Sequence, residues 1–340
     1  KALGRHFEQV RARAHVCVPS ANLVQLGEVE EQRTQDHAVQ EAIAGALPFH
    51  LQSLLPMKPL LESLLVCPHC KQPFSIRKEH LWRCAQDGRE VPLQEGKPIF
   101  TSTPQNAHIF ERIERGPNQG TPWRRANWKF LQQQVHRQPD EAIILDVGAG
   151  HGDFAALFAG RNYLSLDIVP YPEIDLVCDL TECIPFRENT FDMIVLMNVL
   201  EHVYRFHELL AACSYLLKPG GVLVIAVPFL LKVHQIPFDF YRYTHYALEE
   251  MARQHGFEIV LLEGYYDPLF LLGEGIRNLR FWVLPGLLPP LRWLARGLLL
   301  LNEGLLTLLR LPIGKGTTQA PHAAKSPAPV GYHLVWRKPS

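Results

Sequence analysis

The stretch ILDVGAGHGDF, Ile144 to Phe154, decides the fold that this sequence predicts. An apolar run ends at Asp146, and three glycines follow at alternating positions before a helix-prone segment, Phe154 to Phe158. Apolar residues, a glycine turn and a helix-prone segment in this order are typical of a strand, a tight loop and a helix. Glycine adopts positive φ at little cost, so such a loop can bring its backbone against a ligand. The three glycines are Gly148, Gly150 and Gly152.

The spacing of these glycines and the charges beside them indicate the ligand. Dinucleotide-binding loops place the third glycine three residues after the second, whereas here Gly152 follows Gly150 after two, and the next residue is Asp153. A backbone pressed against a pyrophosphate is disfavoured beside two carboxylates, Asp146 and Asp153. A ligand with a cationic ammonium or sulfonium group is favoured there. The loop therefore points to S-adenosylmethionine rather than NAD.

The segments after this loop supply further candidate cofactor residues. Asp167 closes a second apolar stretch, seventeen residues after the second glycine, where an acidic side chain can accept hydrogen bonds from both ribose hydroxyls. Asp179 can accept a hydrogen bond from the exocyclic amine of an adenine, with Leu180 against the ring. Asn198 follows a strand predicted at residues 191–197. The candidate cofactor-binding residues are Asp146, Gly148, Ala149, Gly150, Gly152, Asp167, Ile168, Asp179, Leu180 and Asn198.

Five motifs follow one another in this part of the chain. They are DVGAGHG (146–152), Asp167, CDLTECIPF (178–186), FDMIVLMNVLEHV (191–203) and LLKPGG (216–221). Strand and helix patterns alternate from Ile143 to Val260, as an open, mostly parallel sheet requires. On these motifs the chain resembles the class I S-adenosylmethionine-dependent methyltransferases. The resemblance implies an α/β fold, a Rossmann-like sheet of seven strands with helices on both faces, and a cofactor over the carboxyl ends of strands one to four.

Length and composition bound the class of protein. At 340 residues the chain is long enough for two domains, and its 47% hydrophobic content is that of a soluble globular protein. Its 34 basic and 34 acidic residues balance, which argues against nucleic acid as a partner, because phosphate neutralisation demands a basic face. Seven cysteines without disulfide-like spacing favour a reducing compartment. We expect a cytoplasmic protein without a secretory leader, with peripheral contact at the inner face of the membrane as an alternative.

A second recognisable unit, predicted over residues 61–103, begins with a C-x-x-C turn. Such a turn presents two thiolates to one zinc ion, and a closed tetrahedral site needs two more ligands. The stretch resembles the small zinc-ribbon module that accompanies many methyltransferases, but Asp87 stands where that module has its fourth cysteine. A carboxylate can bind zinc, so the alternatives are a zinc site, with weak or substoichiometric binding, and a degenerate ribbon held by its own small core. The candidate ligands are Cys67, Cys70, Cys84 and Asp87, with His69 and His80 as substitutes.

The flanking segments carry weaker signals. Residues 1–60 are predicted to form a helical amino-terminal segment. The segment PWRRANWKFLQQQVHR (122–137) is basic and aromatic. We expect it to form a helix that leads into the first strand and covers the cofactor cleft, with a nucleic-acid contact as the alternative. The methyltransferase domain is predicted over residues 122–266 and 330–340.

Candidate substrate-facing residues follow the fourth and fifth predicted strands. Methyl transfer from a sulfonium is an in-line displacement, so alignment and exclusion of water matter most, and a base helps only where the acceptor must lose a proton. His202 is either a base or substrate-orienting residue, or a residue that packs beside the adenine. Polar groups crowd residues 232–251, where Asp239 and Arg242 either face the substrate or pair to hold the loop. The candidate catalytic residues are His202, His234, Asp239 and Arg242.

An apolar helical insertion is predicted between the sixth and seventh strands, at residues 267–313, followed by a flexible linker at 314–329. Residues 291–311 are very apolar, and all their polar members except Asn302 fall within one narrow arc at about 100° per residue. The length is near that of a bilayer span, but the polar stripe argues against a lone transmembrane helix. An interfacial membrane helix, a lid over a lipid-like substrate, an oligomer contact and ordinary burial are the alternatives. The stripe residues are Arg292, Arg296, Glu303, Thr307 and Arg310.

These observations support one leading function and two alternatives. The leading function is an S-adenosylmethionine-dependent methyltransferase that acts on a small-molecule, glycan or lipid-linked acceptor by direct in-line transfer. The phrase DFYRYT (239–244) resembles one seen in bacterial methyltransferases of surface-glycan or lipid pathways. An RNA methyltransferase that binds nucleic acid through the ribbon-like module is the second reading, disfavoured by the neutral charge and the apolar insertion. A non-catalytic, membrane-associated scaffold with a vestigial cofactor site is the third.

Overall fold

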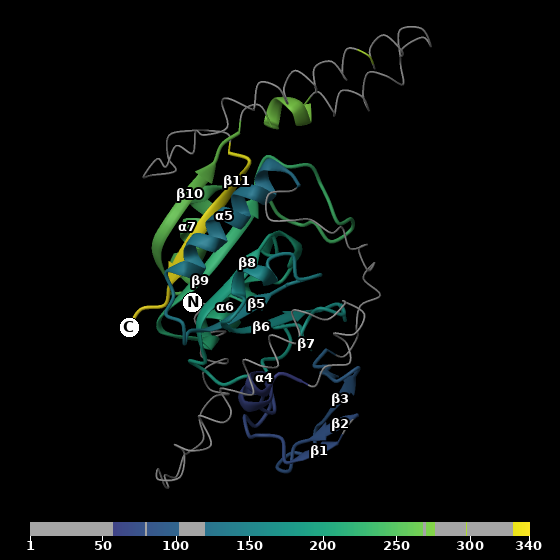
Figure 1. Cartoon of the computed structure of the whole chain (residues 1–340). Coiled ribbons are helices and arrows are strands. Elements are labelled where there is room, and N and C mark those ends of the chain that lie inside the picture. The colour runs from purple at the N-terminus through teal and green to yellow at the C-terminus, as the bar shows by residue number, and fades with distance from the viewer. Residues whose placement is uncertain (1–56, 79, 102–119, 268–269, 276–296, 298–328) are drawn as a thin grey trace. The chain divides into compact units, whose positions relative to one another are not determined.

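The computed structural model describes residues 57–78, 80–101, 120–267, 270–275, 297 and 329–340 (Figure 1). All of them belong to one compact unit, residues 48–340. Most of the predicted helical segment 1–60, most of the predicted insertion 267–313 and nearly all of the predicted linker 314–329 lie outside the described residues.

The larger sheet has seven strands. They are β5 (Ile143–Val147), β6 (Asn162–Asp167), β7 (Leu176–Val177), β8 (Phe191–Met197), β9 (Leu217–Pro228), β10 (Glu258–Tyr265) and β11 (Gly331–Arg337). Their order across the sheet is β10-β11-β9-β8-β5-β6-β7. The five strands from β9 to β7 are parallel, whereas β11 is antiparallel to both β9 and β10. The predicted seven-stranded, Rossmann-like α/β fold is therefore confirmed.

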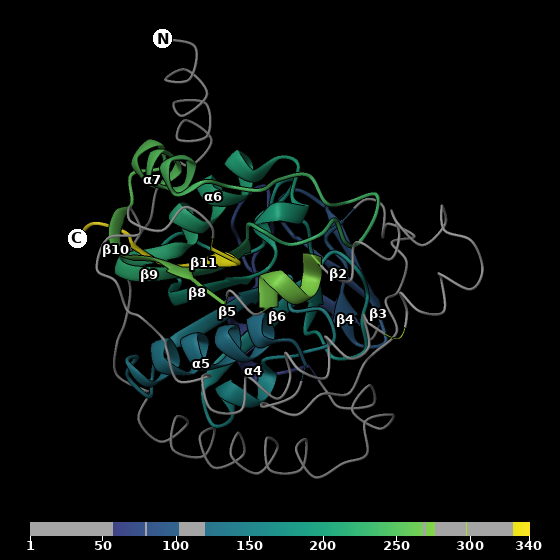
Figure 2. The same ribbon diagram turned by 90° about the horizontal axis from the view of Figure 1, so that it is seen from above.

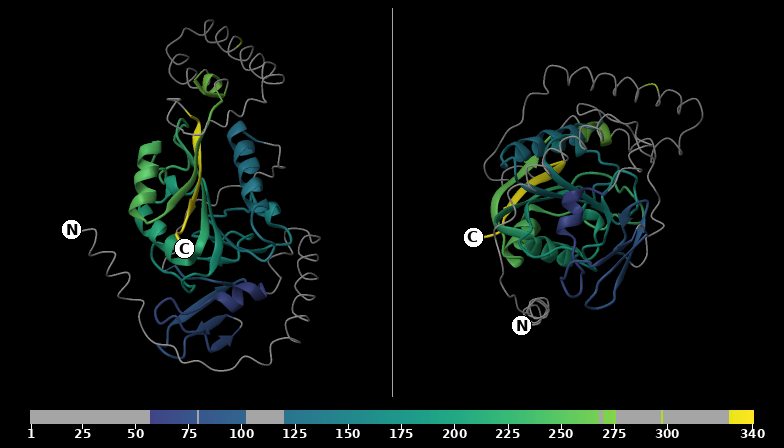
Figure 3. Two further views of the ribbon diagram at one scale, coloured as in Figure 1. Left: turned by 90° about the vertical axis from the view of Figure 1, so that its left-hand side faces the viewer. Right: turned by 60° about the horizontal axis from the view of Figure 1, so that its bottom comes forward.

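Three helices flank this sheet: α5 (Pro122–His136), α6 (Phe206–Leu216) and α7 (His245–Gln254). Successive side chains of a strand point to opposite faces. In β8, Met193 and Val195 pack in the cluster that includes α5, whereas Ile194 and Leu196 pack in the cluster that includes α6 and α7. Figure 3 shows α5 and α7 on opposite sides of the sheet, and Figure 2 shows the same layers from above. The predicted helices on both faces are thus present.

Side-chain caps set two of the helix starts. The Thr121 hydroxyl accepts a hydrogen bond from the Arg124 amide at 3.2 Å, and a proline occupies the first turn of α5. The Thr244 hydroxyl accepts one from the Ala247 amide at 3.2 Å. The predicted helix over 122–137 is confirmed.

The segment after the glycine loop differs from the prediction. The sequence predicts a helix from Phe154 to Phe158, and the structure has a 3-10 helix of four residues, η1 (Ala155–Phe158). The predicted and observed segments both end at Phe158, two residues before Gly160, which has a positive φ of 72°. A residue in the left-handed conformation ends a helix, so the segment stops after one turn.

The smaller sheet has four antiparallel strands in sequence order, preceded by a short helix. They are β1 (Ile76–Lys78), β2 (Leu81–Arg83), β3 (Glu90–Gln94) and β4 (Lys97–Pro98), after α4 (Pro59–Leu64). Leu61, Phe74, Trp82 and Val91 are buried beside them. These apolar side chains give the small sheet its core.

The small sheet continues onto the edge of the large one. Ile99 forms a parallel bridge with Val177 of β7, and the Phe100 amide donates to the Val177 carbonyl at 2.8 Å. The Val66 amide donates to the Pro185 carbonyl at 2.9 Å. The edge strand β7, two residues long, is therefore covered by the chain that leaves the small sheet.

β10 and β11 form the predicted antiparallel hairpin, with the insertion between them. Residues 270–275 are helical, and the Asp267 carboxylate accepts a hydrogen bond from the Phe270 amide at 2.7 Å. Among the residues that the structure describes, no helix combines the length and apolar character needed to cross a bilayer.

Candidate functional site

The glycine loop leaves the carboxyl end of β5 with its three glycines at positive φ, between 55° and 73°. Gly148 and Ala149 donate backbone hydrogen bonds to the Leu166 carbonyl of β6, at 2.9 and 3.1 Å. A Cβ on Gly148 would lie 2.6 Å from the Val199 side chain, whereas a Cβ on Gly150 would meet no atom within 4 Å. Gly150 thus presents bare backbone to open space, as the close approach of a ligand requires.

Asp167 ends β6 beside this loop. Its carboxylate accepts hydrogen bonds from the Gly150 amide at 2.9 Å and the Val169 amide at 3.0 Å. Burial raises the pKa of Asp167, although these amides oppose the shift. The next side chain, Ile168, is 37% exposed. An acidic group beside an exposed apolar one suits a nucleoside, and the ribose role of Asp167 remains a prediction.

Asp179 and Leu180 follow β7 at the same edge of the sheet. The Asp179 carboxylate accepts a hydrogen bond from the Thr181 amide at 2.8 Å. Leu180 is buried in the hydrophobic core rather than displayed at the surface. The adenine contacts that the sequence predicts for these two residues remain predictions.

Asn198 follows β8 in a left-handed conformation, with φ of 57°. Its side-chain oxygen accepts hydrogen bonds from Trp123 Nε1 at 2.9 Å and Asn127 Nδ2 at 3.4 Å. His333 Nε2 of β11 lies 2.8 Å from Asn127 Oδ1, and burial lowers the pKa of His333 to about 3. A neutral His333 therefore donates to Asn127, which donates to Asn198.

Two of these residues were missed by sequence reasoning. Trp123 and Asn127 lie on the basic, aromatic segment 122–137, which sequence reasoning interpreted only as a helix over the cofactor cleft. The sequence signal that could have found them is their spacing. Trp123 and Asn127 both have polar side-chain tips and are four residues apart, so they lie on one face of a helix.

Asp146 lies within β5 beneath the glycine loop. It is buried, and its Oδ2 accepts a hydrogen bond from the Tyr163 hydroxyl at 3.0 Å. Burial raises the pKa of Asp146 to about 7, although the Tyr163 hydrogen bond lowers it. The predicted contact of Asp146 with the cofactor remains a prediction.

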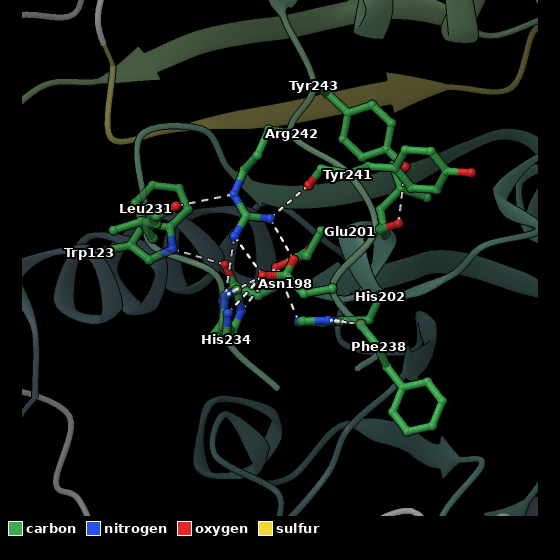
Figure 4. A network of polar contacts seen from close by, with 12 residues as sticks. Trp123, Asn198, Glu201, His202, Leu231, His234, Phe238, Tyr241, Arg242 and Tyr243 are labelled. Atoms are coloured by element: carbon green, nitrogen blue, oxygen red, sulfur yellow. Dashed lines mark hydrogen bonds and ion pairs between the residues drawn. The ribbon is translucent and has the colours of Figure 1, made fainter. Parts of the chain in front are cut away.

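Glu201 and two histidines meet beyond the end of β8 (Figure 4). Glu201 and His202 lie on a 3-10 helix, η2 (Leu200–His202), and His234 lies on the loop after β9. His202 Nε2 is 3.6 Å and His234 Nε2 is 3.9 Å from Glu201 Oε1. Burial raises the pKa of Glu201 to about 8. Sequence reasoning missed Glu201, although a Glu-His pair directly after a buried strand is a signal for such a site.

Asp239 and Arg242 form a bidentate ion pair in the loop after β9. Arg242 Nη1 and Nη2 donate to the two Asp239 oxygens at 2.5 and 2.7 Å, and the His234 amide donates to Asp239 Oδ2 at 2.8 Å. Burial alone would raise the pKa of Asp239, but these hydrogen bonds lower it to about 2. The pair holds His234 in place. This contact corresponds to the alternative in which Asp239 and Arg242 pair to hold the loop.

The comparisons with known proteins agree with this geometry. A family model described as a methyltransferase domain matches residues 122–262. These residues form a class I, S-adenosylmethionine-dependent methyltransferase domain.

Relatives of this domain differ in their named activities. The chain is 28% identical over 159 residues to the ubiquinone/menaquinone biosynthesis C-methyltransferase UbiE of Ruegeria sp., covering 40% of this chain and 59% of that one. It is 28% identical over 172 residues to the mitochondrial arginine-hydroxylase NDUFAF5 of Mus musculus, covering 42% and 49%. The chain therefore spans about half the length of these curated relatives.

A solved structure also aligns with this chain. It is a Burkholderia thailandensis 1,6-didemethyltoxoflavin-N1-methyltransferase with bound S-adenosylhomocysteine. The alignment has 19% sequence identity and a TM-score of 0.40, and it covers 64% of this chain and 79% of that one.

Outside the methyltransferase domain, the four candidate zinc ligands converge. The ligand atoms of Cys67, Cys70, Cys84 and Asp87 all lie within 4.8 Å of one another. Cys67 Sγ is 3.1 Å from Asp87 Oδ2, and Cys70 Sγ is 3.3 Å from Cys84 Sγ. The substitute ligand His69 lies beside the group, with Nδ1 3.2 Å from Asp87 Oδ2.

The protonation of these ligands depends on their burial. Burial raises the pKa of the Cys67 thiol to about 12. Burial alone would also raise the pKa of Asp87, but hydrogen bonds from the Arg89 amide and the Cys67 and Cys84 thiols lower it to about 2. A cation at this point would compete with the thiol protons, because zinc binds thiolates.

The raised pKa of Asp146 predicts a pH-dependent difference from Asp146→Asn. Between about pH 4 and 7 the folded state binds one proton more than the unfolded state. The free energy of unfolding of the wild type therefore falls by up to about 1.4 kcal/mol per pH unit in this range. Asparagine can accept the Tyr163 hydrogen bond and carries no such proton. Urea unfolding at about pH 5 and pH 7.5 should show the stability of the wild type falling relative to the variant as pH rises. An unchanged difference between the two pH values would contradict a raised pKa at Asp146.

Proposed function

We propose that this protein transfers a methyl group from S-adenosylmethionine to an acceptor bound at the carboxyl edge of β5, β6, β8 and β9. The observation that carries the proposal is the open backbone at Gly150 beside Asp167 and the exposed Ile168. In a methyltransferase domain, such a loop receives the methionine part of the cofactor. Asp167 then accepts from the ribose hydroxyls, and Ile168 covers one face of the adenine.

The acceptor is proposed to carry an apolar part. The loop after β9 displays apolar side chains to solvent, with Ile236 72% and Val233 64% exposed. Apolar side chains gathered on one loop favour the binding of an apolar partner. The other exposed apolar members of the loop are Leu230, Phe238 and Phe240. These side chains support a small-molecule, glycan or lipid-linked acceptor over RNA, and the zero net charge adds to this preference.

Methyl transfer needs alignment more than acid–base chemistry. His202 lies near Val199, which packs on Gly148 of the cofactor loop, and His234 lies on the exposed apolar loop itself. Phe240 of that loop donates its amide to the Glu201 carbonyl at 2.9 Å. We propose that these histidines face the acceptor and that Asp239 and Arg242 hold their loop. A peripheral membrane contact by the apolar insertion belongs to the same proposal.

We also propose that Cys67, Cys70, Cys84 and Asp87 bind one zinc ion. Three thiolates and one carboxylate make a four-ligand set, which is typical of a structural zinc site. The small sheet has a modest apolar core, so a metal would add to its stability. The fourth ligand is a carboxylate, and we expect weaker binding than four thiolates would give.

The first test of the proposed function is cofactor binding by isothermal titration calorimetry. The wild type should bind S-adenosylmethionine, and Asp167→Asn should lose roughly 1.5–3 kcal/mol, the contribution of hydrogen bonds to a charged acceptor. Asp140→Asn is the matched control, because the Asp140 side chain is 89% exposed and pairs only at the surface with Arg161. Wild-type protein that binds no S-adenosylmethionine overturns the proposal, and undiminished affinity in Asp167→Asn removes that residue from the site.

The second test concerns the acceptor. Extracts incubated with the protein and S-adenosylmethionine labelled in its methyl group should show label in the organic phase. Val233→Asp and Ile236→Asp should lower this transfer by about tenfold or more, since each loses the burial of a large apolar side chain, without changing cofactor affinity. Tyr246→Asp, at an exposed position on α7, is the control. Label that appears in RNA instead would favour the nucleic-acid alternative.

The third test measures zinc. Elemental analysis of wild-type protein saturated with zinc should give one equivalent more than Cys84→Ser, and a moderate chelator should remove it. Asp87→Cys should keep this equivalent in the presence of that chelator, because a fourth thiolate strengthens the site. Wild type and Asp87→Cys that bind no more zinc than Cys84→Ser would show a ribbon held by its apolar core alone.

A further inference from the structure

The carboxyl group of Glu201 is buried beyond the end of β8. The residue is 0% exposed, and neither carboxyl oxygen has a hydrogen-bond partner among the residues that the structure describes. An unsatisfied buried polar group costs roughly 1–3 kcal/mol, and more if it is charged. A native fold keeps such a group where another species satisfies it.

Two imidazoles turn the same nitrogen toward this carboxyl group. The Nε2 atoms of His202 and His234 lie 3.6 and 3.9 Å from Glu201 Oε1, too far for hydrogen bonds. His202 Nε2 is also buried without a hydrogen-bond partner in the described part of the chain. The three ligand atoms lie within 4.8 Å of one another. Atoms that converge without touching leave a position between them.

The other nitrogen of each imidazole faces oxygen acceptors. His202 Nδ1 donates to the Phe238 carbonyl at 2.6 Å. His234 Nδ1 lies 3.2 Å from Asp239 Oδ2 and 3.3 Å from the Lys232 carbonyl, with Arg242 Nη2 at 3.4 Å. On His234 the two oxygen acceptors lie nearer than the Arg242 donor, so they hold the proton on Nδ1, as the Phe238 carbonyl does on His202. The Nε2 lone pair of each ring is then left toward Glu201. Histidines that ligate metals are held in this way, by a carboxylate or a backbone carbonyl.

The donor set defines the chemistry of the ligand. Two imidazoles and one carboxylate suit divalent transition metals, whereas magnesium and calcium prefer oxygen ligands alone. Metal–ligand distances of roughly 2.0–2.2 Å bring two ligand atoms to within about 4.4 Å of each other, so the observed separations need only a small contraction. The charge of Arg242 is balanced by Asp239 and does not oppose a cation.

We propose that Glu201, His202 and His234 bind one divalent transition-metal cation beside the cofactor loop. Three protein ligands leave open positions for an oxygen of the acceptor. Bound oxygen loses its proton more readily and is held in place, because the cation polarises it. This second part rests on the proposed methyl transfer, whereas the cation site itself does not.

Cobalt(II) is a suitable probe, because its absorption spectrum separates this site from the cysteine cluster. The full chain, freed of metal beforehand, is titrated with cobalt(II) chloride and followed by calorimetry and absorption. One equivalent should bind without the intense thiolate-to-cobalt band that cysteine ligands produce. Glu201→Gln should weaken this binding at least tenfold, and Glu249→Gln, at an exposed position on α7, should leave it unchanged.

His234→Ala provides a second variant that does not alter the core, because the His234 side chain is one-third exposed on a loop. It should weaken cobalt binding to a similar extent even if Glu201→Gln fails to fold. Absence of cobalt binding outside the cysteine cluster, or unchanged binding in His234→Ala, overturns the cation site. Titration with S-adenosylmethionine in metal-free buffer separates the two proposals. Cofactor binding without cobalt binding contradicts only the cation site. Cobalt binding without cofactor binding contradicts only the methyl transfer.

Discussion

The parallel pairing of β5 with β6 and β8 is the constraint on which the rest of the structure depends. Val147 pairs with Leu166 on one side, and Asp146 pairs with Val195 on the other. In parallel strands the carboxyl ends meet at one edge of the sheet, where ligands bind in this class of fold. This pairing brings the glycine loop, Asp167 and Glu201 together at that edge, although Gly148 and Glu201 are 53 residues apart in the sequence.

Carboxyl groups at the two sites fall into two classes according to their hydrogen-bond donors. Among the described residues, Asp146 has one hydrogen-bond donor and Glu201 has none. Burial raises their pKa values to about 7 and about 8. Asp87 and Asp239 are also desolvated, but several donors lower their pKa values to about 2. Burial disfavours the charged form, and donors restore it. Asp239 is therefore an ionised anchor of the loop after β9, whereas burial favours the neutral form of Glu201.

The last strand completes the site from a distance. His333 of β11 stacks between Trp123 and Phe130 of α5, with ring centroids 5.1 and 4.4 Å away. Through Asn127 it supports the left-handed turn at Asn198, which ends β8. The chain must therefore return from the insertion and add β11 between β9 and β10 before this support exists. An insertion at the hairpin is tolerated because it leaves both strands and their register intact.

The sequence by itself determined the class of sheet, the limits of the strand at 191–197 and the glycine loop. Runs of apolar residues, turn glycines and caps such as Thr244 act over a few residues, so they can be recognised without a fold. The four candidate zinc ligands of the small module could also be recognised, since the C-x-x-C turn and the Cys84–Asp87 spacing are local. The segment predicted from Phe154 to Phe158 is a single 3-10 turn, which ends before the left-handed Gly160.

Only the tertiary structure decided which polar side chains meet. The contact of Glu201 with His234 joins the end of β8 to the loop after β9, and the support of Asn198 joins α5 to β11. Burial also depends on the whole fold, and so does the difference between Asp239, which is paired with Arg242, and Glu201, which has no hydrogen-bond partner among the described residues. Sequence spacing fixes neither contacts between distant segments nor desolvation, because both arise when separate elements pack against one another.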